Sequence, residues 1–284
     1  MALWPESVVQ EVAERRAVFV VGAGASMATE DKHGKRPPSW SELLRTLARA
    51  LSRRAEKTYA LKLILNNQFL EAAQIIEESI APAEFASIIQ RELKLRDYTP
   101  SRIHAAILGM DPKVVVTKNY DEIYEKQFSR GPIGNGHVVC KYYDSHFIND
   151  LRSGQRCIFK MHGCVTDPTK IVLSKTSYFR ARRDYRQFFT AMDSLFLVST
   201  LIFVATSFED PDLQLILENN NIAATSNHHH YLITEKLAHT SQRNILRQNY
   251  NIHPIEYKKG NHIKVAEYLE ELRAEVEQWR STHD

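Results

Sequence analysis

The chain has 284 residues, of which 43% are hydrophobic and 25% are charged, a composition typical of a soluble globular protein that can bury a core of normal size. Its 37 basic and 34 acidic residues leave a net charge of +3, which is too balanced to indicate direct nucleic-acid binding. Three cysteines, no apolar leader and no apolar run of about 18 residues exclude a disulfide framework and a membrane span. We therefore expect a cytoplasmic protein that forms a single domain over residues 1–284.

The first elements in chain order are a helix and a buried strand. Residues 5–16 have apolar positions at helical spacing, and residues 17–21 form a continuous apolar run that suits a strand buried on both faces. After a polar loop, Ser39 and Glu42 fit a capping box. The pattern then stays helical to about residue 110, which predicts a helical module of roughly residues 39–110 inserted after the first strand.

Strand patterns return in the second half of the chain. They cover residues 113–116, 156–161, 200–205, 231–233 and 251–257, and Pro254 places the last of these at a sheet edge. The polar segment 219–230 reads as a loop, and residues 262–279 read as an amphipathic helix. This order predicts an α/β fold: a Rossmann-like, mostly parallel sheet flanked by helices, with ligands beyond the carboxyl ends of its strands.

A glycine-rich segment, Gly22-Ala23-Gly24-Ala25-Ser26, follows the first strand directly. Glycines permit a tight turn and close approach to a phosphate, and the amides of a following helix, with Ser26, suit a diphosphate. Met27 stands where dinucleotide-binding dehydrogenases have a third glycine, and Glu42, the acidic residue about 20 positions on, falls on a helix. The segment therefore predicts nucleotide binding but disfavours a nicotinamide dehydrogenase. Taken alone, it also fits a plain strand-to-helix turn.

Polar residues also follow the later strands. Alone, each is typical of a helix cap, a turn or a structural histidine. These residues are Thr117, Asn119 and Asp121; His162 with Gly163; Thr206 with Ser207; and Thr234.

Together and in this order, these segments resemble the sirtuin-like family. That family has a glycine-serine phosphate turn, a Thr-x-Asn-x-Asp segment, a His-Gly pair and a later Gly-Thr/Tyr-Ser turn, where this chain has Ala205 in place of glycine. The resemblance extends from about Val18 to Thr234. It implies NAD as the ligand, with catalysis by Asn119, His162 and Asp121. It also implies NAD contacts by Gly22, Ala23, Gly24, Ser26, Thr117, Thr206, Ser207 and Thr234.

The cysteine content separates branches of that family. Protein-deacylating members carry a zinc module with two Cys-x-x-Cys pairs, whereas this chain has no such pair and too few cysteines for four thiolate ligands. We therefore expect no zinc and no metal ligands, with Cys157 and Cys164 as core residues. The helical insertion resembles the bacterial antiphage-defence branch, whose members destroy NAD. The resemblance thus implies an NAD hydrolase that releases nicotinamide and ADP-ribose and is regulated by a partner protein or by homo-oligomerisation. The alternatives are an NAD-dependent protein deacylase and a non-catalytic module that senses NAD or ADP-ribose.

The chemistry of NAD suits hydrolysis, because the cationic nicotinamide leaves as a neutral molecule without a general acid. The resemblance assigns His162 as a base toward water or a ribose hydroxyl, Asn119 to the ribose or the water, and Asp121 to nicotinamide or to orienting its neighbours. Other conspicuous residues have plainer interpretations. The histidines at 228–230 read as a solvated loop, and the aromatic residues between 178 and 189 read as core positions of one helix. Tyr142, Tyr143 and His146 have no assignment.

Overall fold

The computed structural model describes residues 3–130, 137–206, 211–223 and 228–283, so the predicted site residue Ser207 lies outside the described residues. Its centre is a seven-stranded sheet in the order β3-β4-β2-β1-β5-β6-β7, and every neighbouring pair of strands is parallel. This confirms the predicted α/β fold with a parallel sheet. The strands are β1 Val18–Val21, β2 Val114–Thr117, β3 His137–Lys141, β4 Arg156–Lys160, β5 Leu201–Val204, β6 His230–Glu235 and β7 Ile252–Tyr257.

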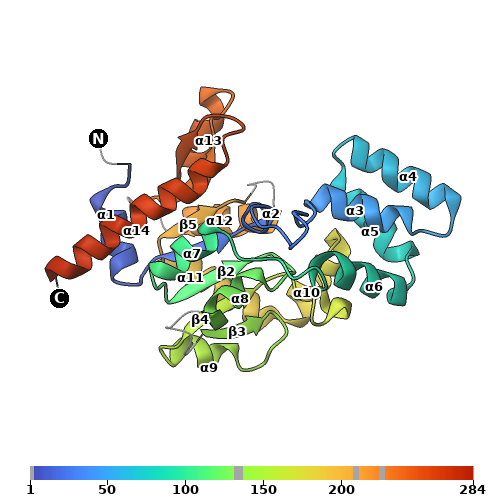
Figure 1. Cartoon of the computed structure of the whole chain (residues 1–284), viewed down its shortest axis with the longest axis horizontal. Coiled ribbons are helices and arrows are strands. Elements are labelled where there is room, and N and C mark those ends of the chain that lie inside the picture. Colours follow the sequence, from blue (N-terminus) through green and yellow to red (C-terminus); the bar gives the residue numbers. More distant parts are fainter. Residues whose placement is uncertain (1–2, 131–136, 207–210, 224–227, 284) are drawn as a thin grey trace.

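Helices cover both faces of the sheet (Figure 1). Strand β1 shows how the alternation of its side chains serves both layers, since Phe19 and Val21 pack into one core and Val18 and Val20 into the other. The first face carries α1 Glu6–Ala13, α7 Arg102–Gly109, α8 Ile123–Arg130 and α14 Ile263–His283. The second face carries α9 Phe147–Arg152, α10 Lys175–Asp184, α11 Arg186–Val198, α12 Pro211–Ala223 and α13 Thr240–Tyr250.

The segment between β1 and β2 is helical, as predicted, and most of it forms a body with its own core at one end of the molecule (Figure 1). We call the four helices of this core the helical module. They are α3 Trp40–Arg49, α4 Arg54–Leu65, α5 Phe69–Ser79 and α6 Pro82–Leu93. The predicted capping box is confirmed, because Ser39 Oγ accepts from the Glu42 amide and Glu42 Oε2 accepts from the Ser39 amide. The last helix before β2, α7, packs instead against α14.

Three sequence predictions about local structure need correction. Strand β3 was not predicted, because four of its five residues are only half-buried and its pattern lacks a continuous apolar run. The expected loop over residues 219–230 is wrong at both ends, since α12 continues to Ala223 and β6 begins at His230. The aromatic residues expected on one helix are divided between α10 and α11, with Tyr185 between the two helices, and Phe179 is 59% exposed rather than part of the core.

The predictions for the last strand and the last helix are confirmed. Strand β7 is an edge strand, as Pro254 predicted, and pairs only with β6 in the described sheet. Helix α14 buries the predicted stripe of Val265, Leu269, Leu272 and Val276. Within the described parts of the chain, none of the helices has the length and apolar character that crossing a membrane requires.

Candidate functional site

A cavity of about 670 Å³ lies between the carboxyl end of the sheet and the helical module. Strand β1 sits at the point where the sheet order turns, since β2 follows it on one side and β5 on the other. In parallel α/β sheets this switch point is where ligands bind, and the volume is within the range of small-molecule sites. The predicted site residues that line the cavity are Ala23, Gly24, Ser26, Asn119, Asp121, His162 and Thr206.

The glycine turn after β1 is packed against the turn after β5. A Cβ added to Gly22 would lie 2.5 Å from the Cα of Thr206, and one added to Gly24 would lie 2.9 Å from the carbonyl oxygen of Ala205. The Gly24 amide donates to that same carbonyl at 2.9 Å. Both glycines are therefore required by the close contact of two strand ends. Gly22 lies behind the cavity wall, whereas Gly24 is part of it.

Ala205 is the position where the family resemblance leads one to expect glycine. Its φ of 51° lies in the left-handed region, which favours glycine because a Cβ crowds the backbone there. Alanine holds this conformation at a cost of about 1 kcal/mol. The alanine at this position therefore carries a conformational cost that a glycine would avoid.

A chain of hydrogen bonds joins β1, β2 and the loop after β2. Thr117 Oγ1 donates to the Val21 carbonyl at 3.0 Å and accepts from the Asn119 amide at 3.0 Å. Asn119 Nδ2 donates to the carbonyl of Gly22 and to Ser26 Oγ, each at 3.0 Å. The side chain of Asn119 is therefore fixed in place at the cavity wall, and the buried Thr117 acts from behind it.

Asp121 extends this network. Its Oδ2 accepts from Ser26 Oγ at 2.8 Å, and its Oδ1 accepts from the Ile123 amide at 3.0 Å, at the start of α8. Asp121 is 6% exposed, so its carboxylate is largely shielded from solvent. Ser26, Asn119 and Asp121, which the sequence grouped by resemblance alone, are thus brought together.

A buried lysine donates to the backbone of the loop after β2. Lys160, the last residue of β4, has no exposed surface, and its Nζ donates to the Asp121 carbonyl and to Glu125 Oε1 at 2.6 Å. Although burial opposes its charged form, the Glu125 carboxylate raises the pKa of Lys160, so the lysine stays protonated. Burial also raises the pKa of Glu125, and Lys160 opposes that shift. Sequence reasoning missed this pair, because a lysine at a strand end resembles an ordinary solvated residue.

His162 lies just after β4, and its side chain lines the cavity. The next residue, Gly163, has a φ of +86°, and a Cβ there would lie 2.5 Å from the Lys170 carbonyl oxygen. His162 lies beside Tyr178, with ring centroids 6.4 Å apart. The Val172 amide donates to the His162 carbonyl at 3.0 Å, which ties this turn to the next stretch of the cavity wall.

The remaining wall comes from residues that the sequence did not single out as site residues. Trp40, Leu43, Phe69, Leu70 and Leu93 belong to the helical module. Only the module's amphipathic pattern could have signalled them, and that pattern does not separate a cavity-facing residue from a core residue. Of the predicted NAD contacts, Gly22, Thr117 and Thr234 do not line the cavity as described, and Thr234 is half-buried on β6.

Sequence comparisons with known proteins identify a family and several relatives. The family model described as a SIR2-like domain matches residues 113–255. The chain is 24% identical over 214 residues to the NAD(+) hydrolase ThsA of Acinetobacter baumannii (strain 532279), which covers 75% of this chain and 40% of that protein. It is 26% identical over 211 residues to the NAD(+) hydrolase ThsA of Bacillus cereus (strain MSX-D12), which covers 73% of this chain and 40% of that protein.

These relatives are much longer proteins, since the chain spans about 40% of their length. A third, from Cytobacillus dafuensis and also named NAD(+) hydrolase ThsA, is 31% identical over 102 residues, or 36% of this chain and 20% of that protein. The family match itself covers half of the chain and contains β2, β4 and their polar ends. By fold, by the placement of Asn119 and His162 and by this match, the chain belongs to the SIR2-like domain family.

Proposed function

We propose that this chain binds NAD in the cavity and hydrolyses it to nicotinamide and ADP-ribose. The observation that carries the proposal is the meeting of the glycine turn, Asn119 and His162 in one cavity at the switch point of the sheet. Support comes from the SIR2-like family match and from relatives that are named NAD(+) hydrolases. NAD is the substrate in this proposal, so no resident cofactor is needed for the reaction.

The proposal places the two halves of NAD on opposite sides of the glycine turn. The diphosphate lies against Ala23, Gly24 and Ser26, at the start of the short helix α2 (Ala23–Met27). The nicotinamide ribose lies toward Asn119 and His162. Thr206 and Ser207, with Thr234 farther along the sheet, serve the adenosine side. Gly22 and Thr117 then act indirectly, by shaping the turn and by holding Asn119.

Asn119 has a defined part in this arrangement. Because Nδ2 donates to Gly22 and Ser26, the carbonyl oxygen Oδ1 is the atom that the proposal assigns to a ribose hydroxyl or to the attacking water. Asp121 holds Ser26 and caps α8, so the proposal gives it the role of orienting its neighbours rather than of binding nicotinamide.

The reaction balances with water as the only co-reactant. The bond between the ribose anomeric carbon and the nicotinamide nitrogen breaks, and its electron pair stays on nicotinamide, which leaves neutral. The water oxygen bonds to the same carbon, and His162 accepts the proton that the water loses. Apolar side chains of the helical module limit the entry of bulk water.

The biological role follows from the family resemblance. We propose that the chain depletes NAD as an effector of bacterial antiphage defence, and that it is held inactive until triggered by a partner protein or by self-assembly. A free NAD hydrolase would harm its own cell, which is the reason to expect such control.

The proposal is tested by incubating the purified chain with NAD and following nicotinamide and ADP-ribose by chromatography, alone and with the proteins encoded beside it. NADH is the matched control, because its uncharged dihydronicotinamide is a poor leaving group and is expected to remain intact. An acetylated peptide in the mixture separates the alternatives: transfer of the acetyl group to the ADP-ribose product would establish a deacylase. Tight NAD binding without turnover in every condition would establish a sensing module and overturn the hydrolase.

A further inference from the structure

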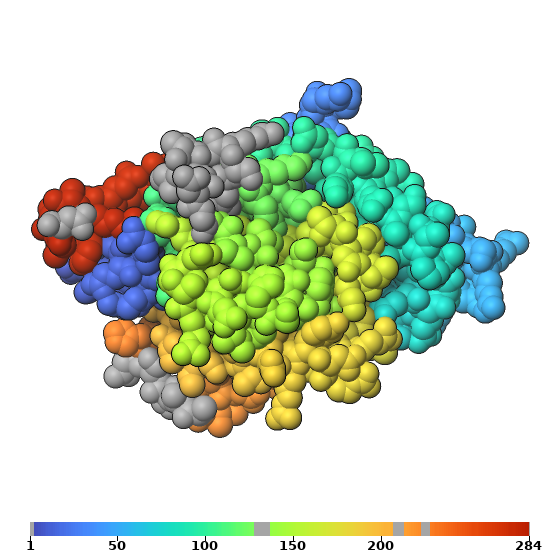
Figure 2. Space-filling view, turned by 90° about the horizontal axis from the view of Figure 1, so that it is seen from below, coloured from blue at the N-terminus to red at the C-terminus, as the bar shows by residue number. Residues whose placement is uncertain are grey.

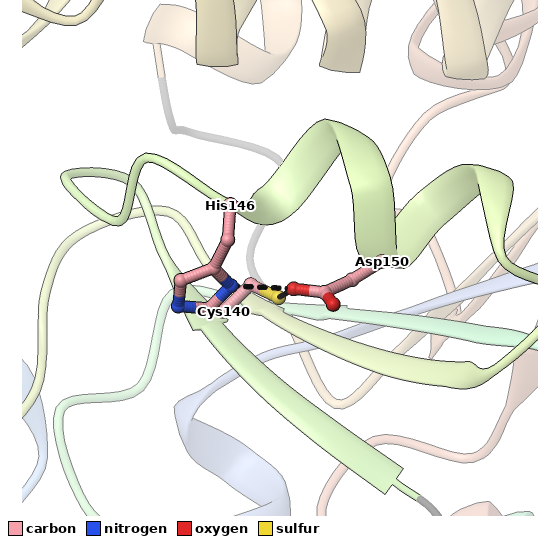
Figure 3. A group of neighbouring side chains, drawn as sticks. All are labelled: Cys140, His146 and Asp150. Atoms are coloured by element: carbon pink, nitrogen blue, oxygen red, sulfur yellow. Dashed lines mark hydrogen bonds and ion pairs between the residues drawn. The ribbon is translucent and has the colours of Figure 1, made fainter.

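A cysteine, a histidine and an aspartate meet at the β3 edge of the sheet, on residues that do not belong to the described wall of the cavity. Cys140 lies on β3, His146 immediately precedes α9, and Asp150 lies one helical turn later. Figure 3 shows the three side chains pointing toward one another. The light-green β3–α9 region lies on the face shown in Figure 2, and within the cluster the His146 side chain is exposed whereas Cys140 is buried.

One carboxylate oxygen connects the cluster. Asp150 Oδ2 accepts from His146 Nδ1 at 2.5 Å and from Cys140 Sγ at 3.4 Å. One ligand atom from each residue lies within 4.8 Å of the others. A surface ion pair between His146 and Asp150 accounts for two members, and the fully buried Cys140 thiol, which also contacts the Cys157 thiol, adds a sulfur atom directed at the same oxygen.

We propose that Cys140, His146 and Asp150 bind one divalent transition-metal ion of the zinc class. Thiolate, imidazole and carboxylate are the three ligand types that zinc takes in proteins, and a soft sulfur ligand disfavours magnesium and calcium. Three protein ligands leave the fourth tetrahedral position to water. The ion takes the place of the protons on Cys140 Sγ and His146 Nδ1, which pass to solvent or, for the imidazole, to Nε2.

The geometry needs an adjustment at His146. Bonds of about 2.0–2.3 Å place the ligand atoms of a tetrahedral ion about 3.3–3.7 Å apart. The Cys140–Asp150 separation of 3.4 Å already fits. The His146–Asp150 contact must open by about 1 Å, and the His146 side chain, which is 55% exposed, can move outward into solvent.

The bound ion has a clear structural effect, because it fastens α9 to the β3 edge of the sheet. If the ion binds here, the sequence expectation that the chain contains no metal ligands has to be revised. The narrower expectation, that the chain lacks the two cysteine pairs of a four-thiolate zinc module, is unaffected. The inference concerns a different site and does not depend on NAD hydrolysis.

The test is a metal-binding measurement on the whole chain, purified without a histidine tag because the imidazoles of such a tag bind zinc themselves. The protein is stripped with a chelator, dialysed against zinc, and its bound zinc is counted by mass spectrometry. Competition with a chromogenic chelator gives the affinity. We expect about one zinc per chain, and an affinity at least tenfold weaker in His146→Gln and in Asp150→Asn.

Matched controls separate this site from adventitious binding. His262→Gln changes another exposed histidine that faces a carboxylate, Glu235, and Cys164→Ser changes another buried cysteine. Both are expected to bind zinc like the unmodified chain. Cobalt(II) should give a thiolate charge-transfer band that Cys140→Ser abolishes. No zinc in the unmodified chain, or unchanged binding in His146→Gln, overturns the proposal; because His146 is exposed, its substitution leaves the fold intact.

Discussion

The cavity has two unlike walls, and the contrast shows how the chain divides its tasks. The sheet wall presents polar side chains that are fixed by hydrogen bonds, with Asn119 held by Gly22 and Ser26. The module wall is apolar, with Trp40 and Phe69 in contact at a ring-centroid distance of 5.6 Å. Reacting groups need fixed geometry, which a rigid sheet edge supplies. The proposed hydrolysis, which admits one water and excludes the rest, needs an apolar cover.

The first prediction tests the chemistry of the sheet wall and has the largest expected effect. His162→Ala should lower kcat for NAD hydrolysis by about 10²–10⁴-fold, because the proposed mechanism makes His162 the base that accepts the proton of the water. The measurement is nicotinamide release at saturating NAD. His239→Ala, an exposed histidine away from the cavity, is the control and should leave the rate unchanged. Equal rates for His162→Ala and the unmodified chain would remove His162 from the mechanism.

The second prediction concerns the support beneath that wall. Lys160→Met leaves Glu125 buried without its partner, so the free energy of unfolding should fall by about 3–5 kcal/mol in urea denaturation. The double variant Lys160→Met/Glu125→Leu should recover most of that loss, because an apolar pair removes the unpaired charge. Turnover should stay low in the double variant, since the Asp121 carbonyl has still lost its donor. Full activity in the double variant would show that Lys160 serves stability alone.

The third prediction concerns the pH dependence of the stability of the fold. Burial lowers the pKa of His104 to about 4, and its Nδ1 is placed to accept from the Ser101 amide at the start of α7. The unfolded chain therefore takes up the proton first, and stability that is complete above about pH 6.5 falls progressively toward pH 4, by roughly 3 kcal/mol at most. His104→Gln keeps an acceptor for the cap and removes the titration.

The check is urea denaturation of the unmodified chain and of His104→Gln between pH 7 and pH 4. The variant should lose less stability over this interval than the unmodified chain, while His33→Gln, at an exposed histidine, should follow the unmodified chain. The same slope in both His104 forms would assign the acid sensitivity to other groups.

The fourth prediction tests the module wall and has the smallest expected effect. Phe69→Ala removes apolar surface from the cavity without touching the polar network, so KM for NAD should rise about fivefold, equivalent to about 1 kcal/mol, with kcat nearly unchanged. Leu65→Ala, on the exposed face of α4, is the matched control and should change neither constant. A large fall in kcat for Phe69→Ala would mean that the two walls do not divide their tasks as described.

The two walls also differ in how far the sequence predicts them. The sheet wall could be predicted, because buried parallel strands are continuous apolar runs and the polar residue that ends each run marks the ligand edge. Asn119 and His162 were found in this way. Lys160 was not, since nothing in the local pattern distinguishes a buried lysine from a solvated one until its partner Glu125 is placed beside it.

The module wall could not be predicted. Trp40 and Phe69 are apolar residues on amphipathic helices, and which of these face a cavity depends on how the module docks on the sheet. Strand β3 was missed for a related reason, because a half-buried edge strand gives a weak pattern, and the Cys140–His146–Asp150 cluster was missed with it. Long-range packing decides these features, and no short window of sequence contains it.

The most direct test of NAD binding in the cavity is a crystal structure of the His162→Ala variant with NAD, in which slow turnover preserves the substrate. We expect NAD in the cavity, with its diphosphate against residues 23–26 and the nicotinamide ribose within hydrogen-bonding distance of Asn119 Oδ1. NAD bound elsewhere, or a cavity without NAD at a concentration that protects the unmodified chain from thermal unfolding, would contradict it.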